Sequence, residues 1–153
     1  MLTNSEIMAV VKSKVRFFSN DLRPNLKNVQ RLKQFIELIF KKERRSIDYI
    51  NYIFCSDKDL LRLNRTFLDH DFYTDVITFD LSSGKRKISA EIYISLDRVR
   101  DNAKQMGVSL KSEIHRVIFH GALHLCGYND KSKGDLAIMR KEEKKLLSKY
   151  FKT

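Results

Sequence analysis

The segment His120-Gly-Ala-Leu-His124-Leu-Cys-Gly-Tyr-Asn-Asp130 combines two histidines at helical spacing with a glycine that can end the helix. Four residues of α-helix turn through about 400°, so His120 and His124 are expected on one face, one turn apart. Two imidazoles at this spacing can hold one divalent ion. Gly127 favours a left-handed C-cap, after which the chain can bring the carboxylate of Asp130 back as a third ligand. Three protein ligands with one open position are typical of a catalytic metal centre.

Other interpretations of the two histidines stay open at this point. They could fall four residues apart on an ordinary amphipathic helix that holds no ion. A zinc peptidase of the HExxH type is disfavoured, because Gly121 stands where such an enzyme needs its glutamate base. Cys55 and Cys126 are expected to pack in the core. The two remaining histidines are expected outside the ligand set, with His115 structural or solvent-facing and His70 in a surface loop.

Around this segment the sequence predicts a series of helices and strands. Ser109 is expected to open the helix that carries both histidines. Other helices are predicted over 28–45, after Ser56, over 96–106 ending near Gly107, and from Asp135 to Tyr150. Strands are predicted for Val10-Val11 with Val15–Phe18, for Ile47–Cys55, for Asp75–Asp80 and for Ile88–Ser95, the last two paired across a turn.

The fold class predicted from this order is α+β, as one domain over 1–153 with a small mixed four-stranded sheet flanked by helices. The metal site is expected on a helix near the C-terminal third. The chain shows neither an internal repeat nor a linker long enough to divide it.

The charge of the chain indicates the class of its partner. There are 30 Lys and Arg residues against 19 Asp and Glu residues, a formal net charge of +11, which attracts polyanions. The predicted helix over 28–45 has a basic face that is a candidate RNA contact, although it could equally be a solvated surface. No apolar run is long enough for a membrane span, and no secretory signal is evident. Two cysteines form no disulfide framework, so a cytoplasmic location is expected.

Two blocks of residues resemble the YbeY family, bacterial metal-dependent endoribonucleases involved in ribosomal RNA maturation. His120-Gly121-x-Leu123-His124-Leu125-x-Gly127-Tyr128 is similar to the family's H-G-x-L-H-L-x-G-Y-D-H segment. Leu63-Asn64, Asp71, Thr74-Asp75-Val76 and Phe79 are similar to its L-N…D-x-P-T-D-V-L-S-F segment, and Ala90–Ser95 stands in the place of its G-D-I-x-I-S strand. The resemblance spans roughly residues 50–147.

The resemblance implies a metal-dependent, single-strand-specific endoribonuclease that acts in maturation of the 3′ end of 16S ribosomal RNA and in ribosome assembly. It implies one divalent transition metal ion, with Zn²⁺ favoured, on His120, His124 and Asp130. The catalytic residues would be the two histidines with Asp75 and Glu91, the carboxylates orienting a histidine or accepting a proton. The implied partners are precursor ribosomal RNA and the small ribosomal subunit or its proteins, with neither a membrane nor a small-molecule cofactor.

Three positions depart from the family pattern. Asp130 replaces a third histidine, and its harder oxygen ligand would hold Zn²⁺ less selectively against Mn²⁺. Leu68 replaces an arginine that could clamp a phosphate, for which Arg65 is a candidate substitute, and Glu91 replaces an aspartate. The loss at Leu68 favours an alternative function, a non-catalytic RNA-binding ribosome-assembly factor with a structural metal. The open coordination position favours the enzyme.

Overall fold

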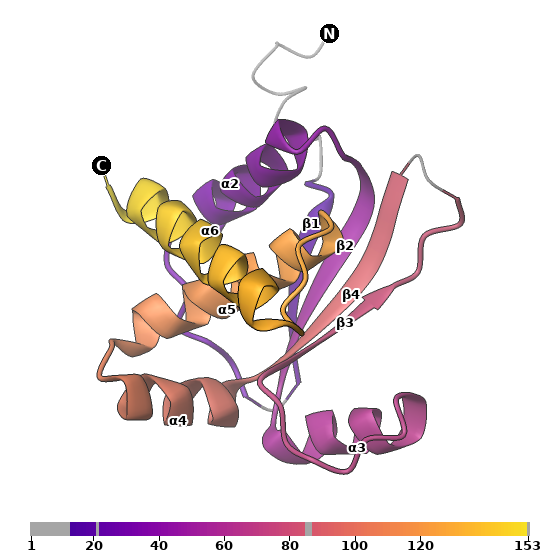
Figure 1. Cartoon of the computed structure of the whole chain (residues 1–153), viewed down its shortest axis with the longest axis vertical. Helices are drawn as coiled ribbons and strands as arrows, with labels where there is room; N and C mark the ends of the chain where they lie inside the picture. The colour runs from indigo at the N-terminus through magenta and orange to yellow at the C-terminus, as the bar shows by residue number, and fades with distance from the viewer. Residues whose placement is uncertain (1–12, 21, 85–86, 153) are drawn as a thin grey trace, which may run out of the picture.

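The structure, a computed structural model, describes residues 13–20, 22–84 and 87–152 (Figure 1). Its elements in chain order are β1 (Val15–Ser19), α2 (Val29–Lys42), β2 (Ser46–Cys55), α3 (Asp57–Phe67), β3 (Val76–Asp80), β4 (Lys87–Ser95), α4 (Leu96–Met106), α5 (Leu110–Leu125) and α6 (Lys133–Phe151). Within these ranges no helix has both the length and the apolar character needed to cross a membrane.

The four strands form one mixed sheet in the order β1-β2-β4-β3. β2 pairs in parallel with both β1 and β4, whereas β3 runs antiparallel to β4 at the edge. The predicted α+β class, the mixed four-stranded sheet and the pairing of the third and fourth strands are therefore confirmed.

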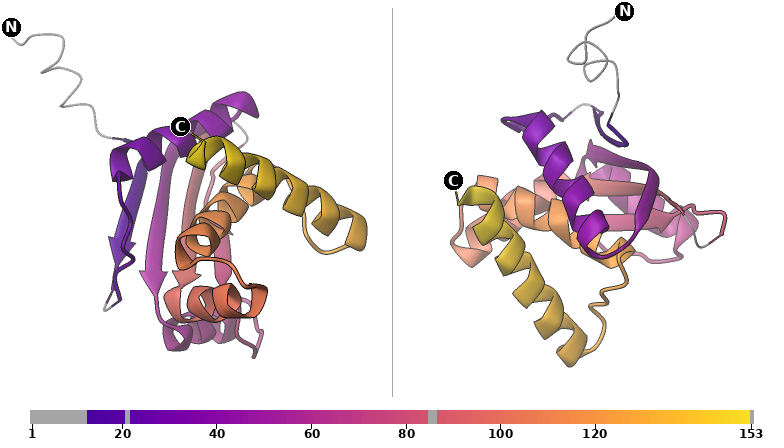
Figure 2. Two further views of the ribbon diagram at one scale, coloured as in Figure 1. Left: turned by 90° about the vertical axis from the view of Figure 1, so that its left-hand side faces the viewer. Right: turned by 90° about the horizontal axis from the view of Figure 1, so that it is seen from above.

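Helices cover the two faces of the sheet unequally. α2, α5 and α6 lie on one face (Figure 2), where they bury the main core against the side chains of Ile50, Tyr52 and Ile92. A smaller core on the other face joins Leu60 of α3 to Cys55 and to residues of β3 and β4. Side chains alternate along each strand, so successive residues of β4 belong to different cores.

α5 is the central helix, and it packs closely on β4. Gly121 makes this approach possible, because a Cβ atom at that position would lie 3.0 Å from Cγ2 of Ile92. The buried positions of α5 extend over most of its circumference, from Glu113 to Leu123. A helix that is buried on nearly all sides holds its few polar side chains in fixed positions.

Local signals set the ends of the helices that frame the site. Ser109 caps α5 by accepting a hydrogen bond from the Ser112 amide, as predicted. Gly127 takes a positive φ of 103° directly after the helix, and the Tyr128 amide donates to the Leu123 carbonyl, which confirms the predicted glycine turn. Cys55 and Cys126 are buried free thiols, also as predicted.

Other boundaries differ from the prediction. α2 ends at Lys42 rather than near residue 45, since Arg44 takes a positive φ of 58° and turns the chain into β2. α6 begins at Lys133, two residues earlier than predicted, because Ser132 caps it. The strand predicted for Val15–Phe18 is confirmed as β1, and the predicted part at 10–11 lies outside the described residues.

Candidate metal centre

His120 and His124 project from the last two turns of α5. Their rings are nearly parallel, with an interplanar angle of 5° and centroids 6.5 Å apart. The His120 side chain is 12% exposed, whereas His124 is exposed. The predicted placement of both imidazoles on one helix face is therefore confirmed.

Each imidazole uses its Nδ1 atom for a contact with an acceptor. Nδ1 of His120 lies 2.7 Å from Oε2 of Glu143, and Nδ1 of His124 lies 3.1 Å from the carbonyl oxygen of Tyr128. A carbonyl oxygen or an ionised carboxylate can only accept, so in both rings Nδ1 carries the hydrogen. Nε2 is then the ring nitrogen that each histidine can offer to a metal ion, in the orientation that metal-ligating histidines adopt.

Asp130 approaches one of the two histidines. Its Oδ2 atom is 3.2 Å from Nε2 of His120, after the chain reverses at Gly127. Two ligands of one tetrahedral Zn²⁺, each bonded at about 2.0–2.2 Å, lie about 3.4 Å apart. The spacing of this nitrogen and oxygen pair therefore fits two ligands of one ion.

The three predicted ligands are not arranged around a common metal position in this structure. Across the described part of the chain, no group of three His, Cys, Asp or Glu side chains is arranged to hold a metal ion. The structure nevertheless brings together chemically suitable metal ligands, two Nε2 atoms and one carboxylate. His120 contacts Asp130 and lies parallel to the His124 ring.

Glu143 of α6 fixes the orientation of His120 from the buried side. The carboxylate is only 1% exposed and also accepts from Arg140 and Arg116, at 2.7 and 3.1 Å. Burial by itself would raise the pKa of Glu143. Hydrogen bonds from His120 and Arg140, together with the charges of Arg116 and Arg140, outweigh it and lower the pKa below its ordinary value. Glu143 is therefore an anion beside the imidazole.

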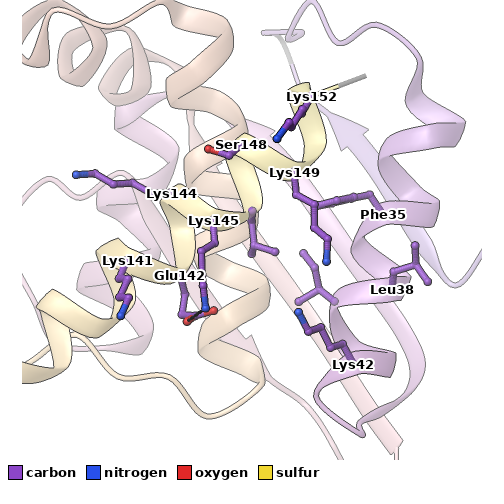
Figure 3. A pocket seen from close by; sticks show the side chains of 12 residues that line it. Phe35, Leu38, Lys42, Lys141, Glu142, Lys144, Lys145, Ser148, Lys149 and Lys152 are labelled. Carbon is purple, nitrogen blue, oxygen red and sulfur yellow. Dashed lines mark hydrogen bonds and ion pairs between the residues drawn. The ribbon is translucent and has the colours of Figure 1, made fainter.

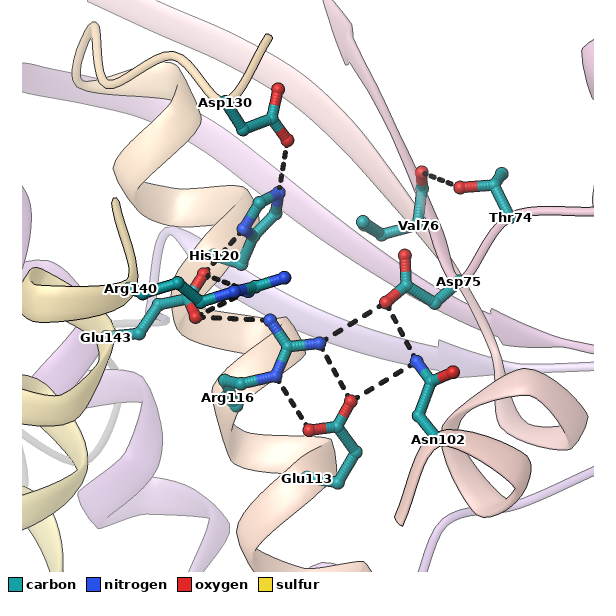
Figure 4. A network of polar contacts seen from close by, with 10 residues as sticks. All are labelled: Thr74, Asp75, Val76, Asn102, Glu113, Arg116, His120, Asp130, Arg140 and Glu143. Atoms are coloured by element: carbon teal, nitrogen blue, oxygen red, sulfur yellow. Dashed lines mark hydrogen bonds and ion pairs between the residues drawn. The ribbon is translucent and has the colours of Figure 1, made fainter. Parts of the chain in front are cut away.

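Arg116 links Glu143 to two further acidic side chains (Figure 4). Its guanidinium binds Glu113 through two nitrogens, at 2.7 and 2.8 Å, and contacts Oδ2 of Asp75 at 3.4 Å. Burial would lower the pKa of Arg116, but the hydrogen bond to Glu113 and the neighbouring carboxylates raise it instead. Asn102 completes the network by donating to Asp75 at 3.1 Å.

The two carboxylates predicted to be catalytic, Asp75 and Glu91, have different partners in the structure. Asp75 joins the network that reaches His120 through Arg116 and Glu143. Glu91 accepts instead from the Tyr93 hydroxyl, at 3.3 Å. Because Ile92 faces α5, the neighbouring Glu91 points to the opposite face of the sheet. The expectation that Asp75 or Glu91 orients a histidine is thus corrected for His120, where Glu143 makes the contact.

The other candidate ligands are engaged elsewhere. His115 is 4% exposed and stacks on Tyr150, in agreement with a structural role. Burial and the charge of Glu43 raise the pKa of the Cys126 thiol to about 12, so it is protonated and a poor ligand at neutral pH. His70 lies exposed in the loop after α3, as predicted.

The segment after α3 carries Leu68, one of the three positions that differ from the family pattern. Leu68 is 39% exposed and ends α3. Arg65, the candidate substitute for the missing arginine, forms an exposed ion pair with Asp71. Buried Asn64 holds this loop, since its side-chain amide donates to the Phe72 carbonyl at 2.9 Å.

A large surface groove lies between α2 and α6, with a volume of about 820 Å³ (Figure 3). Its floor is apolar, with Phe35, Leu38 and Leu146, and lysines of both helices surround it. Neither histidine of the pair lines it, so the groove is separate from the candidate metal centre.

Several residues of the site were not predicted from the sequence. Glu143 lies four residues after buried Met139, so it is a carboxylate on the apolar stripe of α6. Glu113 and Arg116, three residues apart, interrupt the apolar surface of α5 in the same way. A charged residue at a core position of an amphipathic helix is the signal that could have identified them.

Several known proteins are similar to this chain in sequence or in structure. The family model described as endoribonuclease YbeY matches residues 17–151. A protein of Cytophaga hutchinsonii named endoribonuclease YbeY is 49% identical over 132 residues, covering 86% of this chain and 92% of its own. A protein of the same name from Parabacteroides distasonis is 40% identical, covering 88% and 94%. The solution structure of TM1509 from Thermotoga maritima superposes with a TM-score of 0.60 at 28% identity, covering 90% and 89%.

Proposed function

The chain belongs to the endoribonuclease YbeY family and is thus an RNA-cleaving enzyme, and from this premise we propose that it is metal-dependent and cuts single-stranded precursor ribosomal RNA. Its metal ion is held by His120, His124 and Asp130. The observation that carries the proposal is the pairing of both Nδ1 atoms with acceptors, which leaves both Nε2 atoms to serve as ligands, that of His120 beside the Asp130 carboxylate.

One divalent transition metal ion, with Zn²⁺ favoured, suits this donor set. Asp130 contributes a harder ligand than imidazole, so Mn²⁺ is the competing ion to test. Such an ion, when bound, supplies Lewis acidity toward a phosphate oxygen and toward a water molecule.

The residues of the chain supply orientation and charge. Glu143 keeps the Nδ1 hydrogen of His120 in place and so presents Nε2, while Arg116 holds Glu143 and Asp75 in fixed relation. Asp75 is the carboxylate of this network proposed to position a reacting group or to accept a proton. The net charge of +11 raises the local concentration of RNA.

The proposed setting is maturation of the 3′ end of 16S ribosomal RNA and ribosome assembly in the cytoplasm, in contact with the small ribosomal subunit. The alternative to the function of the family, a non-catalytic assembly factor with a structural metal, has one observation in its favour. The family arginine is absent at Leu68, and the nearby Arg65 is paired with Asp71.

The first experiment is elemental analysis of the untagged protein beside His124→Ala. His70→Ala serves as the matched control, because it removes an exposed loop histidine outside the site. We expect about one equivalent of a transition metal in the wild type and in the control, and a loss in His124→Ala. Metal retained in His124→Ala would contradict the proposed ligand set.

RNA cleavage separates the two functions. An enzyme cuts single-stranded RNA when metal is loaded, and a folded His120→Ala variant purified in the same way does not. Equal cleavage by wild type and variant would indicate a contaminating ribonuclease. A metal-loaded protein that binds RNA without cutting it would support the assembly factor instead.

A further inference from the structure

A second cavity, of about 600 Å³, lies away from the histidine pair. It is bounded by the segment before α2 and the start of that helix, by α4, by the beginning of α5 and by the end of α6. His115 lines it, whereas His120 does not. Five residues along a helix are about 140° around its axis, so the cavity and the metal centre open on different sides of α5.

The cavity concentrates positive charge. Five cationic side chains line it, and the described lining contains no Asp or Glu. None of the five forms an ion pair with a carboxylate among the described residues, although Arg98 and Arg116 elsewhere do. The five are Arg23, Lys27, Arg31, Arg100 and Lys111. Like charges gathered without counterions repel one another, and a bound anion would relieve that repulsion.

Aromatic rings form one wall of the cavity. Tyr150 is only 2% exposed, because Arg31 lies over its ring, 4.1 Å from the centroid, and His115 stacks on the same ring with the centroids 5.3 Å apart. Phe151 is 37% exposed and is therefore the ring that a base can reach, and Nζ of Lys111 lies 5.1 Å from its centroid. A flat apolar surface beside cations is the arrangement with which proteins bind a base and its phosphate together.

The same wall offers a hydrogen-bond acceptor. Nδ1 of His115 lies 2.7 Å from the Lys111 carbonyl oxygen, so this nitrogen carries the hydrogen and Nε2 is the acceptor. Burial lowers the pKa of His115, and the charges of Lys111 and Arg31 lower it further, which keeps the ring neutral. A neutral acceptor among cations suits a hydroxyl or an amino group rather than a second phosphate.

We propose that this cavity binds a nucleoside phosphate, either as a free nucleotide or as one nucleotide of an RNA strand. The cations would contact the phosphate, the aromatic wall the base, and His115 a donor group of the ribose or base. The volume lies within the range of about 300–1,000 Å³ typical of small-ligand sites. An acidic peptide would use the cations but not the flat aromatic wall.

The test measures binding rather than cleavage, so its outcome does not depend on the proposed endoribonuclease activity. Calorimetry with adenosine 5′-monophosphate and anisotropy with a labelled oligoribonucleotide are performed with a chelator present. The pocket variant is Arg23→Glu/Arg100→Glu, which reverses two exposed charges of the cavity. Its matched control, Lys58→Glu/Lys87→Glu, makes the same change in net charge at exposed positions that do not line the cavity.

We expect the pocket variant to weaken binding of the nucleotide or the oligoribonucleotide by at least about tenfold, and the control by far less. The neutral pair Arg23→Gln/Arg100→Gln should give an intermediate loss and guards against misfolding of the charge reversal. Binding of the nucleotide identifies a free ligand, and pocket-dependent binding of the oligoribonucleotide alone identifies an RNA strand. Equal losses in pocket and control variants would overturn the proposal, as would unchanged binding in both or equally strong binding of polyglutamate.

Discussion

The Nδ1 atom of His120 lies 2.7 Å from Oε2 of Glu143, a carboxylate with only 1% of its side chain exposed. The two residues are on different helices, so the packing of α6 against α5 determines that Nε2 of His120, and not Nδ1, faces Asp130. The packing of the core and the chemistry of the candidate metal centre therefore depend on the same contact.

Replacing Glu143 with glutamine should weaken metal binding by about 10- to 100-fold, because the imidazole loses its anionic partner while most of the side-chain shape remains. The affinity for Zn²⁺ can be measured by competition with a chromophoric chelator. Glu142→Gln is the matched control, since the neighbouring residue pairs with Lys145 instead. Equal affinities of both variants and the wild type would show that the His120–Glu143 contact does not serve the metal site.

Substitutions of the two predicted catalytic carboxylates, Asp75 and Glu91, should differ in their effect on the rate of RNA cleavage. Asp75→Asn disturbs the contact with Arg116 and should lower the rate of RNA cleavage by about tenfold or more with metal still bound. Glu91→Gln should leave both the rate and the metal content nearly unchanged, because Glu91 lies on the other face of the sheet. A larger loss for Glu91→Gln would reverse this assignment. Single-turnover cleavage of one RNA by both metal-loaded variants provides the comparison.

Local features of the sequence were sufficient for much of the fold. α4 spans the predicted residues 96–106, because Ser95 caps its start and Gly107 caps its end, and both caps directly flank the helix in the sequence. The early end of α2 was not predictable in this way, since Arg44 adopts a left-handed conformation that ordinarily favours glycine. The turn lies between α2 and β2, two elements whose packing depends on the rest of the fold.

The candidate site was only partly predictable for a related reason. His120, His124 and Asp130 are close in sequence, so helical geometry and one glycine turn relate them. Glu143 meets His120 across 23 positions, and the contact between Arg116 and Asp75 spans 41. Such contacts depend on how α5, α6 and the sheet pack, which no local pattern specifies.

Gly121→Ala should destabilise the protein by about 1–3 kcal/mol, because the added methyl group would lie 3.0 Å from Cγ2 of Ile92 and push α5 from β4. Gly134→Ala on α6 is the matched control. Its Cβ would meet no atom within 4 Å, and Gly134 is in the first turn of α6, so the change should stabilise the protein by at most about 1 kcal/mol through helix propensity. Urea unfolding followed by circular dichroism gives both values. If both changes stabilised equally, the close approach at Gly121 would not limit packing.

Binding of RNA should weaken steeply as salt rises, because each phosphate that the protein neutralises releases counterions. The measurement is the affinity for a single-stranded oligoribonucleotide across a series of salt concentrations, with a chelator present to prevent cleavage. A linear fall of log affinity with log salt is expected. Affinity that does not change between low and moderate salt would contradict a role for the net charge of +11.

Asp57 should make stability depend on pH. Burial would raise the pKa of this carboxyl group, but hydrogen bonds from Arg98 and Ser95, both at 2.7 Å, and the charge of Arg98 lower the pKa below its ordinary value. A group with a lowered pKa in the folded state stabilises the fold fully above its unfolded pKa. That stabilisation is lost as the pH falls through the folded value.

Asp57→Asn should therefore lower the free energy of unfolding by about 1–2 kcal/mol at neutral pH. The difference from the wild type should narrow as the pH falls through the lowered pKa of the folded state, because the wild-type carboxylate then becomes protonated and loses its charge. Urea unfolding of both proteins at each pH measures this difference directly. A difference that stays constant from neutral to acidic pH would mean that the shape of Asp57, and not its charge beside Arg98, stabilises the junction of α3 with α4.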